Sequence, residues 1–350
     1  MPLFASASRP GSPGTRVASS QGMMPKQLIP HHSLPLAIFL VILVSCAPEA
    51  AGPPVDVTTV TSSYVPLAQN KTIDDVLLGN VLGAKPEVKE GIAKLSFPRT
   101  DIPVEVDGNT LPPFMGLTSW TSFMPSEKPA VEAMVMGDLV LFEDEVGPAM
   151  SAALDNGLAV TALHNHFFFD KPRVYFMHIS GEGRTFALAK AVKAVHDAQA
   201  AVRQKSELPQ SSFGSPAVTV PSRIDGAKLD AVFGIKGTAK DGMYKVVIGR
   251  KATASTGDAI GKAMGVNTWA AFAGTDDSAL VDGDFAVTES ELQSVLKALK
   301  AGDIHVVAIH SHMTGENPRI LFLHFWGRGP ATRLATTLER AVNLTESEVR

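Results

Sequence analysis

Runs and alternations of apolar residues divide the chain after residue 72 into short strands and helices. The pattern predicts a short helix near Ile73–Leu82. Four strand-like segments are predicted after it, at 92–97, 103–107, 116–123 and 132–142. The next elements are predicted as helix, strand, strand and helix, at about 144–156, 158–164, 173–179 and 184–199. A β-rich half followed by an α-β-β-α unit predicts an α+β fold.

The same pattern occurs twice along the chain. His310-Ser311-His312 lies 146 residues after His164-Asn165-His166, and further pairs match at that offset: Asp170 with Glu316, Pro172 with Pro318, Arg173 with Arg319, His178 with His324, Gly181 with Gly327 and Gly183 with Gly329. We therefore expect a duplication of a unit of about 125 residues. Repeat 1 is predicted at 72–200, a Ser/Pro-rich linker at 201–222 and repeat 2 at 223–345. We expect the repeats to pack on each other about a pseudo-two-fold axis.

The N-terminal apolar run Leu34–Val44 is too short to span a bilayer comfortably, and it fits the core of a secretory signal. We expect residues 1–45 to be a signal segment whose true start is Met23 or Met24. The only cysteine, Cys46, follows directly and resembles the lipidated cysteine of bacterial lipoproteins. The alternative is a stray cysteine of the signal peptide. The Pro- and Thr-rich residues 46–71 then predict the lipidated end and a flexible tether.

Composition narrows the class of partner. The chain has 350 residues, of which 45% are hydrophobic and 19% charged, and its net charge is −4. These values are typical of globular proteins. The weak negative charge, with no basic run interleaved with aromatic residues, argues against a nucleic-acid partner.

The repeated histidines are the main candidate chemistry. Two histidines in a His-x-His strand share one face of a sheet, because side chains alternate. If His164 faces Tyr175 across the hairpin, His178 points to the other side. If the register slips by one residue, so that residue 164 faces Phe176 or His178, all three imidazoles share a face. Such a cluster could bind Zn, Mn, Fe(II) or Cu, with zinc the leading expectation. The candidate metal ligands are His164, His166, His178, His310, His312 and His324.

Charged residues beside the histidines have candidate roles too. Asp170 and Glu316 are predicted as ligands or as the general base of a metal-dependent hydrolase. Arg173 and Arg319 would either bind an anionic or carboxylate ligand at the mouth of the site or form ion pairs with these two acids. The competing interpretation is that the histidines are structural, within a non-catalytic lipoprotein that binds an envelope ligand or partner.

Four other features of the pattern carry expectations. Gly181 and Gly183 are expected to form a tight strand-to-helix turn. Asp138 and Asp284 are interpreted as turn residues in preference to a second carboxylate of the site. Trp120 and Trp269 are expected in the core. The loop Phe167–Phe169 is expected to be buried under the other repeat, or else to contact an apolar ligand or membrane.

The chain resembles the LppY/LpqO-like exported proteins, which are built on a domain of unknown function. The resemblance rests on three groups of residues: His164-Asn165-His166 with Pro172-Arg173, His178 and Gly181-x-Gly183; Leu111-Pro112-Pro113 with Trp120; and Met136-Gly137-Asp138-Leu139 with Glu143-Asp144-Glu145. It implies a lipid-anchored protein of the bacterial cell envelope but no established activity. Repeat 1 departs from the family in its Phe167–Lys171 loop, so repeat 2 is the expected working copy.

Overall fold

The computed structural model describes residues 72–214, 217–218 and 221–347. The predicted signal segment, its start at Met23 or Met24, Cys46 and the tether lie outside these residues. In the part of the chain that is described, none of the helices combines the length and the apolar character needed to cross a bilayer.

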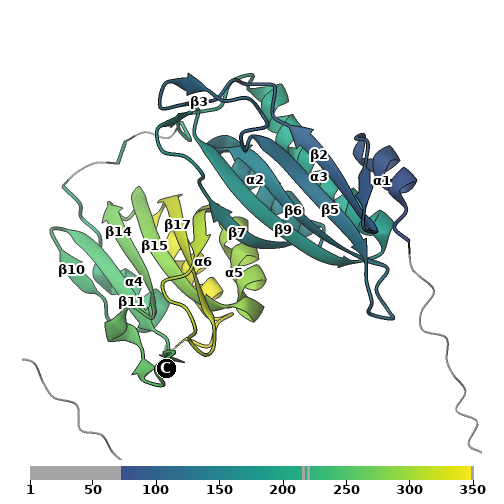
Figure 1. Cartoon of the computed structure of the whole chain (residues 1–350). Coiled ribbons are helices and arrows are strands. Elements are labelled where there is room, and N and C mark those ends of the chain that lie inside the picture. Colours follow the sequence, from purple (N-terminus) through teal and green to yellow (C-terminus); the bar gives the residue numbers. More distant parts are fainter. Residues whose placement is uncertain (1–71, 215–216, 219–220, 348–350) are drawn as a thin grey trace, which may run out of the picture. The chain divides into compact units, whose positions relative to one another are not determined.

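Repeat 1 contains these elements in chain order: α1 (Asp75–Leu82), β1 (Glu87–Lys89), β2 (Ile92–Pro98), β3 (Glu105–Val106), β4 (Asn109–Thr110), β5 (Thr118–Pro125), β6 (Ala133–Phe142), α2 (Glu143–Asp155), β7 (Ala159–His164), β8 (Asp170–Lys171), β9 (Val174–Gly183) and α3 (Thr185–Lys205). Repeat 2 contains α4 (Gly226–Phe233), β10 (Thr238–Lys240), β11 (Met243–Gly249), β12 (Ala252–Thr253), β13 (Ala259–Ile260), the 3-10 turn η1 (Lys262–Met264), β14 (Asn267–Gly274), β15 (Ala279–Thr288), α5 (Glu289–Ala301), β16 (Ile304–His310), β17 (Ile320–Gly329) and α6 (Ala331–Val342). The fold is α+β, as predicted, and its strands are mostly antiparallel (Figure 1).

A 12-stranded sheet contains strands from both repeats, in the order β1-β2-β5-β6-β9-β7-β16-β17-β15-β14-β11-β10. The order of repeat 1, from the edge strand β1 inward to β7, is matched by the equivalent strands of repeat 2, from the edge strand β10 inward to β16. At the middle, Leu163 of β7 pairs with Ile309 of β16 in antiparallel orientation. The internal duplication predicted from the sequence is therefore present in the fold.

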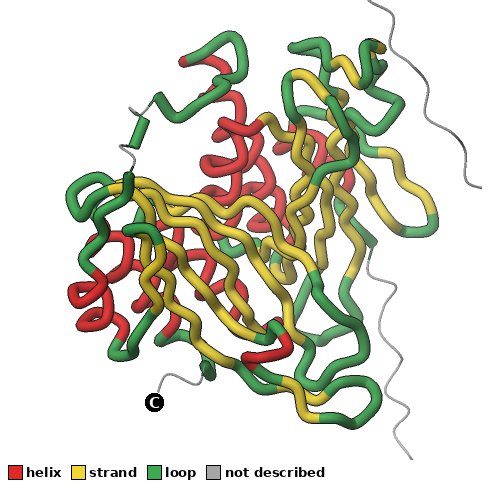
Figure 2. The backbone as a smooth tube through the Cα atoms, turned by 90° about the vertical axis from the view of Figure 1, so that its left-hand side faces the viewer, coloured by secondary structure: helices red, strands yellow, loops and turns green. Residues whose placement is uncertain are grey.

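The helices cover one face of the strands, as Figures 1 and 2 show. The alternation of buried and exposed side chains along strand β6 shows which face the helices cover. Val135, Leu139 and Leu141 are fully buried in the cluster that includes helix residues, whereas Met136 is 54% exposed. Because side chains alternate across a sheet, Asp138 lies on the face without helices. The candidate site is on that face.

Both central helices begin with the same device. The N–H of Phe142 donates to Glu145 Oε2 (3.0 Å) at the start of α2, and the N–H of Thr288 donates to Glu291 Oε2 (2.8 Å) at the start of α5. The second bond belongs to a capping box formed by Thr288 and Glu291. Each glutamate also forms an ion pair with a buried arginine, Glu145 with Arg99 and Glu291 with Arg250.

The tight strand-to-helix turn predicted at Gly181 and Gly183 lies slightly later: β9 continues through both residues and pairs with β6, and α3 begins at Thr185, two residues after the strand ends. A Cβ atom at Gly181 would lie 2.9 Å from Leu158 Cδ2 and 3.1 Å from Leu188 Cδ2. Glycine lets the strand approach these two buried side chains closely. The closing helix α3 then extends to Lys205, beyond the predicted end and into the predicted linker.

The favoured expectation for the phenylalanine loop is also wrong. Phe168 is 85% exposed and Phe169 is 76% exposed, so neither is buried under the other repeat. Phe167 alone is partly buried, in a small cluster that includes Phe176. A loop of this length can bury one ring beside its own hairpin and leaves the other two in solvent.

Candidate metal centre

The strand register brings three histidines of each repeat to one face. His164 pairs with Phe176 in repeat 1, and His310 pairs with Phe322 in repeat 2. Directly paired residues share a face of the sheet, and so do residues two positions apart. His178 and His324 therefore lie on the same side as the His-x-His pairs. Of the two registers left open by the sequence, the structure has the one that assembles a cluster.

The imidazoles of each cluster are close together. In repeat 2 the ring centroid of His310 lies 5.0 Å from that of His312 and 4.8 Å from that of His324. In repeat 1 the corresponding distances from His164 are 5.2 Å to His166 and 5.1 Å to His178.

Asp284 supplies a carboxylate to the cluster of repeat 2. It is paired with His324 across β15 and β17, it is 2% exposed, and its Oδ2 lies 3.3 Å from His312 Nε2. Its Oδ1 is buried and has no hydrogen-bond partner among the described residues. The interpretation of Asp284 as a turn residue is wrong, because it lies inside a ten-residue strand. The signal that could have found it is the repetition of Gly-Asp in both copies, combined with the alternation of the strand.

Asp284, His310 and His312 form a group that could hold a metal ion. One ligand atom from each residue can be chosen so that all lie within 4.8 Å of one another. Imidazole nitrogen and carboxylate oxygen are donors that suit Zn²⁺ and other divalent transition metals. The part of the chain that is described contains no other such group.

Backbone carbonyls fix the orientation of two rings in repeat 2. His310 Nδ1 lies 3.0 Å from the carbonyl oxygen of Phe322, and His324 Nδ1 lies 3.3 Å from that of Gly283. A carbonyl only accepts, so each Nδ1 carries a proton, and in the neutral form of each ring the lone pair is on Nε2. Metal-ligating histidines are commonly oriented in this way. His312 instead stacks on Phe322, with ring centroids 3.5 Å apart and an interplanar angle of 9°.

Burial sets the charges of the group. It raises the pKa of Asp284 above its ordinary value, while His324 and His310 act in the opposite direction. Burial also lowers the pKa of His312, and His310 and His324 lower it further. At neutral pH His312 is therefore neutral, which is the form that can donate a lone pair to a metal.

The cluster of repeat 1 is arranged differently. His178 Nε2 lies 3.0 Å from His164 Nε2, so these two nitrogens share a hydrogen bond. Asp138 Oδ1 is 4.0 Å from His178 Nε2. Asp138 lies inside β6 and is not a turn residue either. In repeat 1 the Nε2 atoms of His164 and His178, which would ligate a metal, are hydrogen-bonded to each other.

Asp170 and Glu316 form hydrogen bonds within the loops that connect the hairpin strands. Asp170 Oδ2 accepts from the N–H of Val174 (2.6 Å), and Glu316 Oε1 accepts from the N–H of Ile320 (2.9 Å). Both side chains are buried. The structure thus gives each acid a positioning bond to the start of the next strand, and neither belongs to the Asp284 group. Their role as ligand or general base stays a prediction.

The two arginines lie beside the helix starts. Arg319 Nη1 donates to Glu289 Oε1 (3.1 Å) on the surface, so its partner is an acid of α5 and not Glu316. Arg173 lines a hollow together with Glu143 and Asp170.

The two tryptophans are only half-buried, contrary to the expectation that they lie in the core. Each has a lysine Nζ over its ring: Lys94 lies 4.7 Å from the ring centroid of Trp120, and Lys245 lies 3.9 Å from that of Trp269.

The fold and this site define a tandemly duplicated α+β protein with a histidine–aspartate cluster in its second copy. Its family is shown by a profile that matches residues 77–198 and 227–344: the chain belongs to the family described as Domain of Unknown Function (DUF1259). The two matches agree with the internal duplication.

Solved structures add one weak similarity, to a trimeric bacterial microcompartment shell protein, PduB. The identity is 14%, the match covers 73% of this chain and 89% of that one, and the TM-score is 0.18. A comparison with curated proteins finds no match.

Proposed function

We propose that repeat 2 binds a divalent transition metal ion, with zinc as the preferred metal, through Asp284, His310 and His312. The observation that carries the proposal is the convergence of one buried carboxylate and two imidazoles within 4.8 Å. Asp284 Oδ1, which is buried without a partner among the described residues, supports it independently. A buried carboxylate oxygen without a partner is costly unless something positive binds it.

His324 is proposed as a further ligand. It lies outside the group that converges within 4.8 Å, but its ring is next to that of His310, and the contact of its Nδ1 with the Gly283 carbonyl leaves Nε2 to face the cluster in the proposed metal-bound state. His312 has a side chain that is 38% exposed, so the cluster opens to solvent on one side. An open side is the feature that separates catalytic from purely structural zinc sites.

Hydrolysis is the chemistry proposed for this centre. A bound metal would lower the pKa of a coordinated water to about 7, which provides a nucleophile at neutral pH. Glu316 is proposed as the general base of this copy, because its Oε2 is buried and unpartnered within the described residues while Oε1 holds the loop. The proposed substrate is a component of the cell envelope. Repeat 1, with Asp170 and its paired histidines, is proposed as the copy without a loaded metal.

Export and anchoring complete the proposal. The apolar run Leu34–Val44 followed by Cys46 supports a lipoprotein held at the membrane by a lipid on that cysteine. The same features support placing the chain with the LppY/LpqO-like exported proteins within its family. The mirrored strand order and the pairing of Leu163 with Ile309 support packing of the repeats about a pseudo-two-fold axis.

Metal analysis of the purified mature protein tests the proposal. We expect stoichiometric metal in the wild type, loss of it in the double variant His310→Ala/His312→Ala, and retention in the matched double variant His164→Ala/His166→Ala. Unchanged metal content in the first variant would overturn the proposal. Metal bound at repeat 2 without hydrolytic turnover would instead favour the non-catalytic alternative.

A further inference from the structure

The two repeats meet differently on the two sides of the Leu163–Ile309 pair. On one side, Gln293 of α5 reaches the edge of β7. Its Oε1 accepts from the N–H of Val160 (2.9 Å) and its Nε2 donates to the carbonyl oxygen of Val160 (2.9 Å). A single side-chain carboxamide thus satisfies the backbone donor and acceptor of Val160, where β7 and β16 are not paired with each other.

The counterpart of this contact lacks the carboxamide. Helices α2 and α5 are related by the offset of 146 residues, so Gly147 stands in the position of Gln293 and Val306 in that of Val160. The register also repeats: Val306 pairs with Phe325 before an irregularity, as Val160 pairs with Ile179. The N–H and C=O of Val306 therefore point out of the β16–β17 ladder, and Gly147 has no side chain to meet them.

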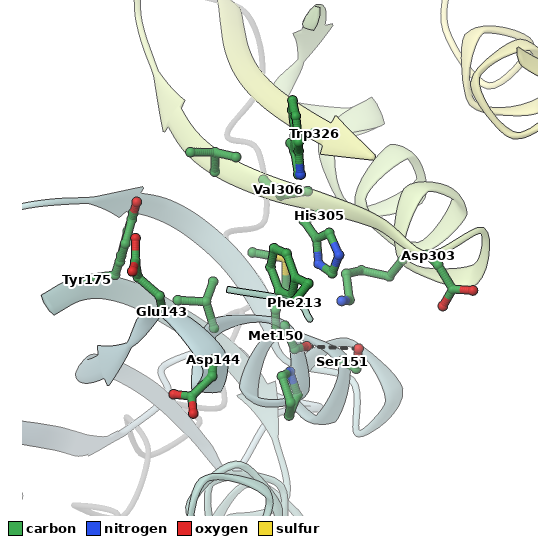
Figure 3. Close-up of a pocket in the computed structure, with 15 residues that line it drawn as sticks. Glu143, Asp144, Met150, Ser151, Tyr175, Phe213, Asp303, His305, Val306 and Trp326 are labelled. Carbon is green, nitrogen blue, oxygen red and sulfur yellow. Dashed lines mark hydrogen bonds between the residues drawn. The ribbon is translucent and has the colours of Figure 1, made fainter. Parts of the chain in front are cut away.

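A cavity lies at this place. It has a volume of about 430 Å³ and is lined by residues of both repeats, including Gly147 and Val306. Figure 3 shows His305, Phe213 and Trp326 around it, together with Val306. The volume is in the range of small-molecule sites. Val306 is only 5% exposed, so its outward polar groups lie in a largely buried setting where a partner matters.

The lining has also changed in chemical type between the copies. Lys300 stands where repeat 1 has the buried Leu154, and His305 stands where repeat 1 has Ala159. His305 stacks on Phe213, with ring centroids 4.0 Å apart and an interplanar angle of 8°. At Val160 the space is filled by Gln293 of the same chain. At Val306 the equivalent space is an open cavity, lined by the aromatic rings of Phe213, His305 and Trp326.

We propose that this cavity binds a small aromatic carboxamide, whose amide group takes the place of the Gln293 carboxamide at Val306. The carbonyl oxygen of the ligand accepts from the N–H of Val306, and its NH₂ donates to the C=O of Val306. The ring lies beside Phe213, His305 and Trp326. This site is separate from the histidine cluster and does not depend on a metal.

Benzamide is the probe for the test, and N,N-dimethylbenzamide, which lacks the N–H donor, is its matched control. A fragment of this size is expected to bind with Kd of about 1 mM. NMR titration of the full chain should shift the backbone amide signal of Val306 with benzamide. The dimethyl compound should bind at least about tenfold more weakly, because the carbonyl of Val306 then stays unpaired.

Two variants test the site from the protein side. Gly147→Gln should fill the cavity as Gln293 fills its counterpart, abolish benzamide binding and raise Tm. A Cβ atom at this position would meet only the flexible Nζ of Lys300, at 3.0 Å. Asp155→Gln, on an exposed position of the same helix, should leave binding unchanged. Absence of saturable benzamide binding, equal binding of the two amides, or full binding by Gly147→Gln would each overturn the proposal.

Discussion

Leu163 of β7 and Ile309 of β16 are antiparallel partners, and they are also equivalent residues of the two repeats, 146 positions apart. The pairing between β7 and β16 is confined to this one position. Beyond it, side chains must fill the space between the strands and the helices of the opposite repeat. Gln293 does so on one side, and Gly147 leaves the other side open.

Replacing Gln293 with Ala should lower the free energy of unfolding by about 1–3 kcal/mol. The change removes the only side-chain partner that the described residues give to the N–H and C=O of Val160, and orphaned buried backbone groups cost this much. Urea unfolding measures the effect. Lys297→Ala, an exposed position on the same helix, is the control and should change stability by less than about 0.5 kcal/mol. Equal effects of the two changes would contradict the bridging role of Gln293.

Replacing Glu145 with Gln should cost about 3–5 kcal/mol, because it removes the buried negative charge that pairs with both Arg99 and Arg203 and leaves Arg99 with only the more exposed Asp101. Glu145 is 0% exposed, and both of its oxygens bond to Arg99, at 2.6 and 2.8 Å. Glu182→Gln breaks the exposed pair with Lys128 and should cost no more than about 1 kcal/mol. Chemical denaturation of both variants checks the contrast, and a small loss for Glu145→Gln would show that the pair does not stabilise this fold.

Asp284→Asn should reduce zinc affinity by at least about 100-fold, since an amide oxygen lacks the negative charge that a buried metal site requires. Competition with a chromophoric chelator gives the affinity. Asp138→Asn makes the same change in repeat 1 and should leave zinc affinity unchanged. If both variants bind zinc like the wild type, the metal is held elsewhere.

Stability should depend on pH through His196. Burial lowers the pKa of His196 to about 4, opposed by Asp197 and reinforced by Arg99 and Lys193. Its ring packs on Phe97 with centroids 4.2 Å apart. The unfolded chain takes up this proton near pH 6.5, whereas the folded chain does so only near pH 4. Stability is therefore retained above pH 6.5 and falls by about 1.4 kcal/mol per pH unit as the pH drops from 6.5 to 4.

The variant His196→Gln isolates this contribution, because glutamine does not titrate. The unfolding free energy of the variant should vary less between pH 7 and pH 4.5 than that of the wild type, by roughly 3 kcal/mol. Denaturation curves across that range give both slopes. Identical slopes would mean that His196 is protonated in the folded state.

Local pattern predicted much of the fold and part of the site. The helix 144–156 and the strands 132–142 and 158–164 match α2, β6 and β7 closely, because alternation and helical periodicity are properties of the segment itself. The role of Gly181 was missed, since the side chains of Leu158 and Leu188 that crowd this position come from other segments.

In the candidate site too, some features could be predicted from a single segment and others depend on contacts between segments. Repetition of the histidines marked both clusters, but Asp284 was interpreted as a turn residue because a Gly-Asp pair within one segment looks like a turn. Only the pairing of β15 with β17 places its carboxylate beside His324 and His312. The exposure of Phe168 and Phe169 likewise depends on how the whole hairpin packs.

The sequence by itself determined the duplication, the α+β class and the three histidines of each copy, because these follow from periodicity and from identity at a fixed offset. The tertiary structure decided the register, which differs by one residue between a histidine cluster and two unrelated faces. It also decided which copy gathers Asp284 with His310 and His312, and where the absence of a side chain at Gly147 opens a cavity. Distances between strands and helices far apart in the chain fix these features, and no single segment contains that information.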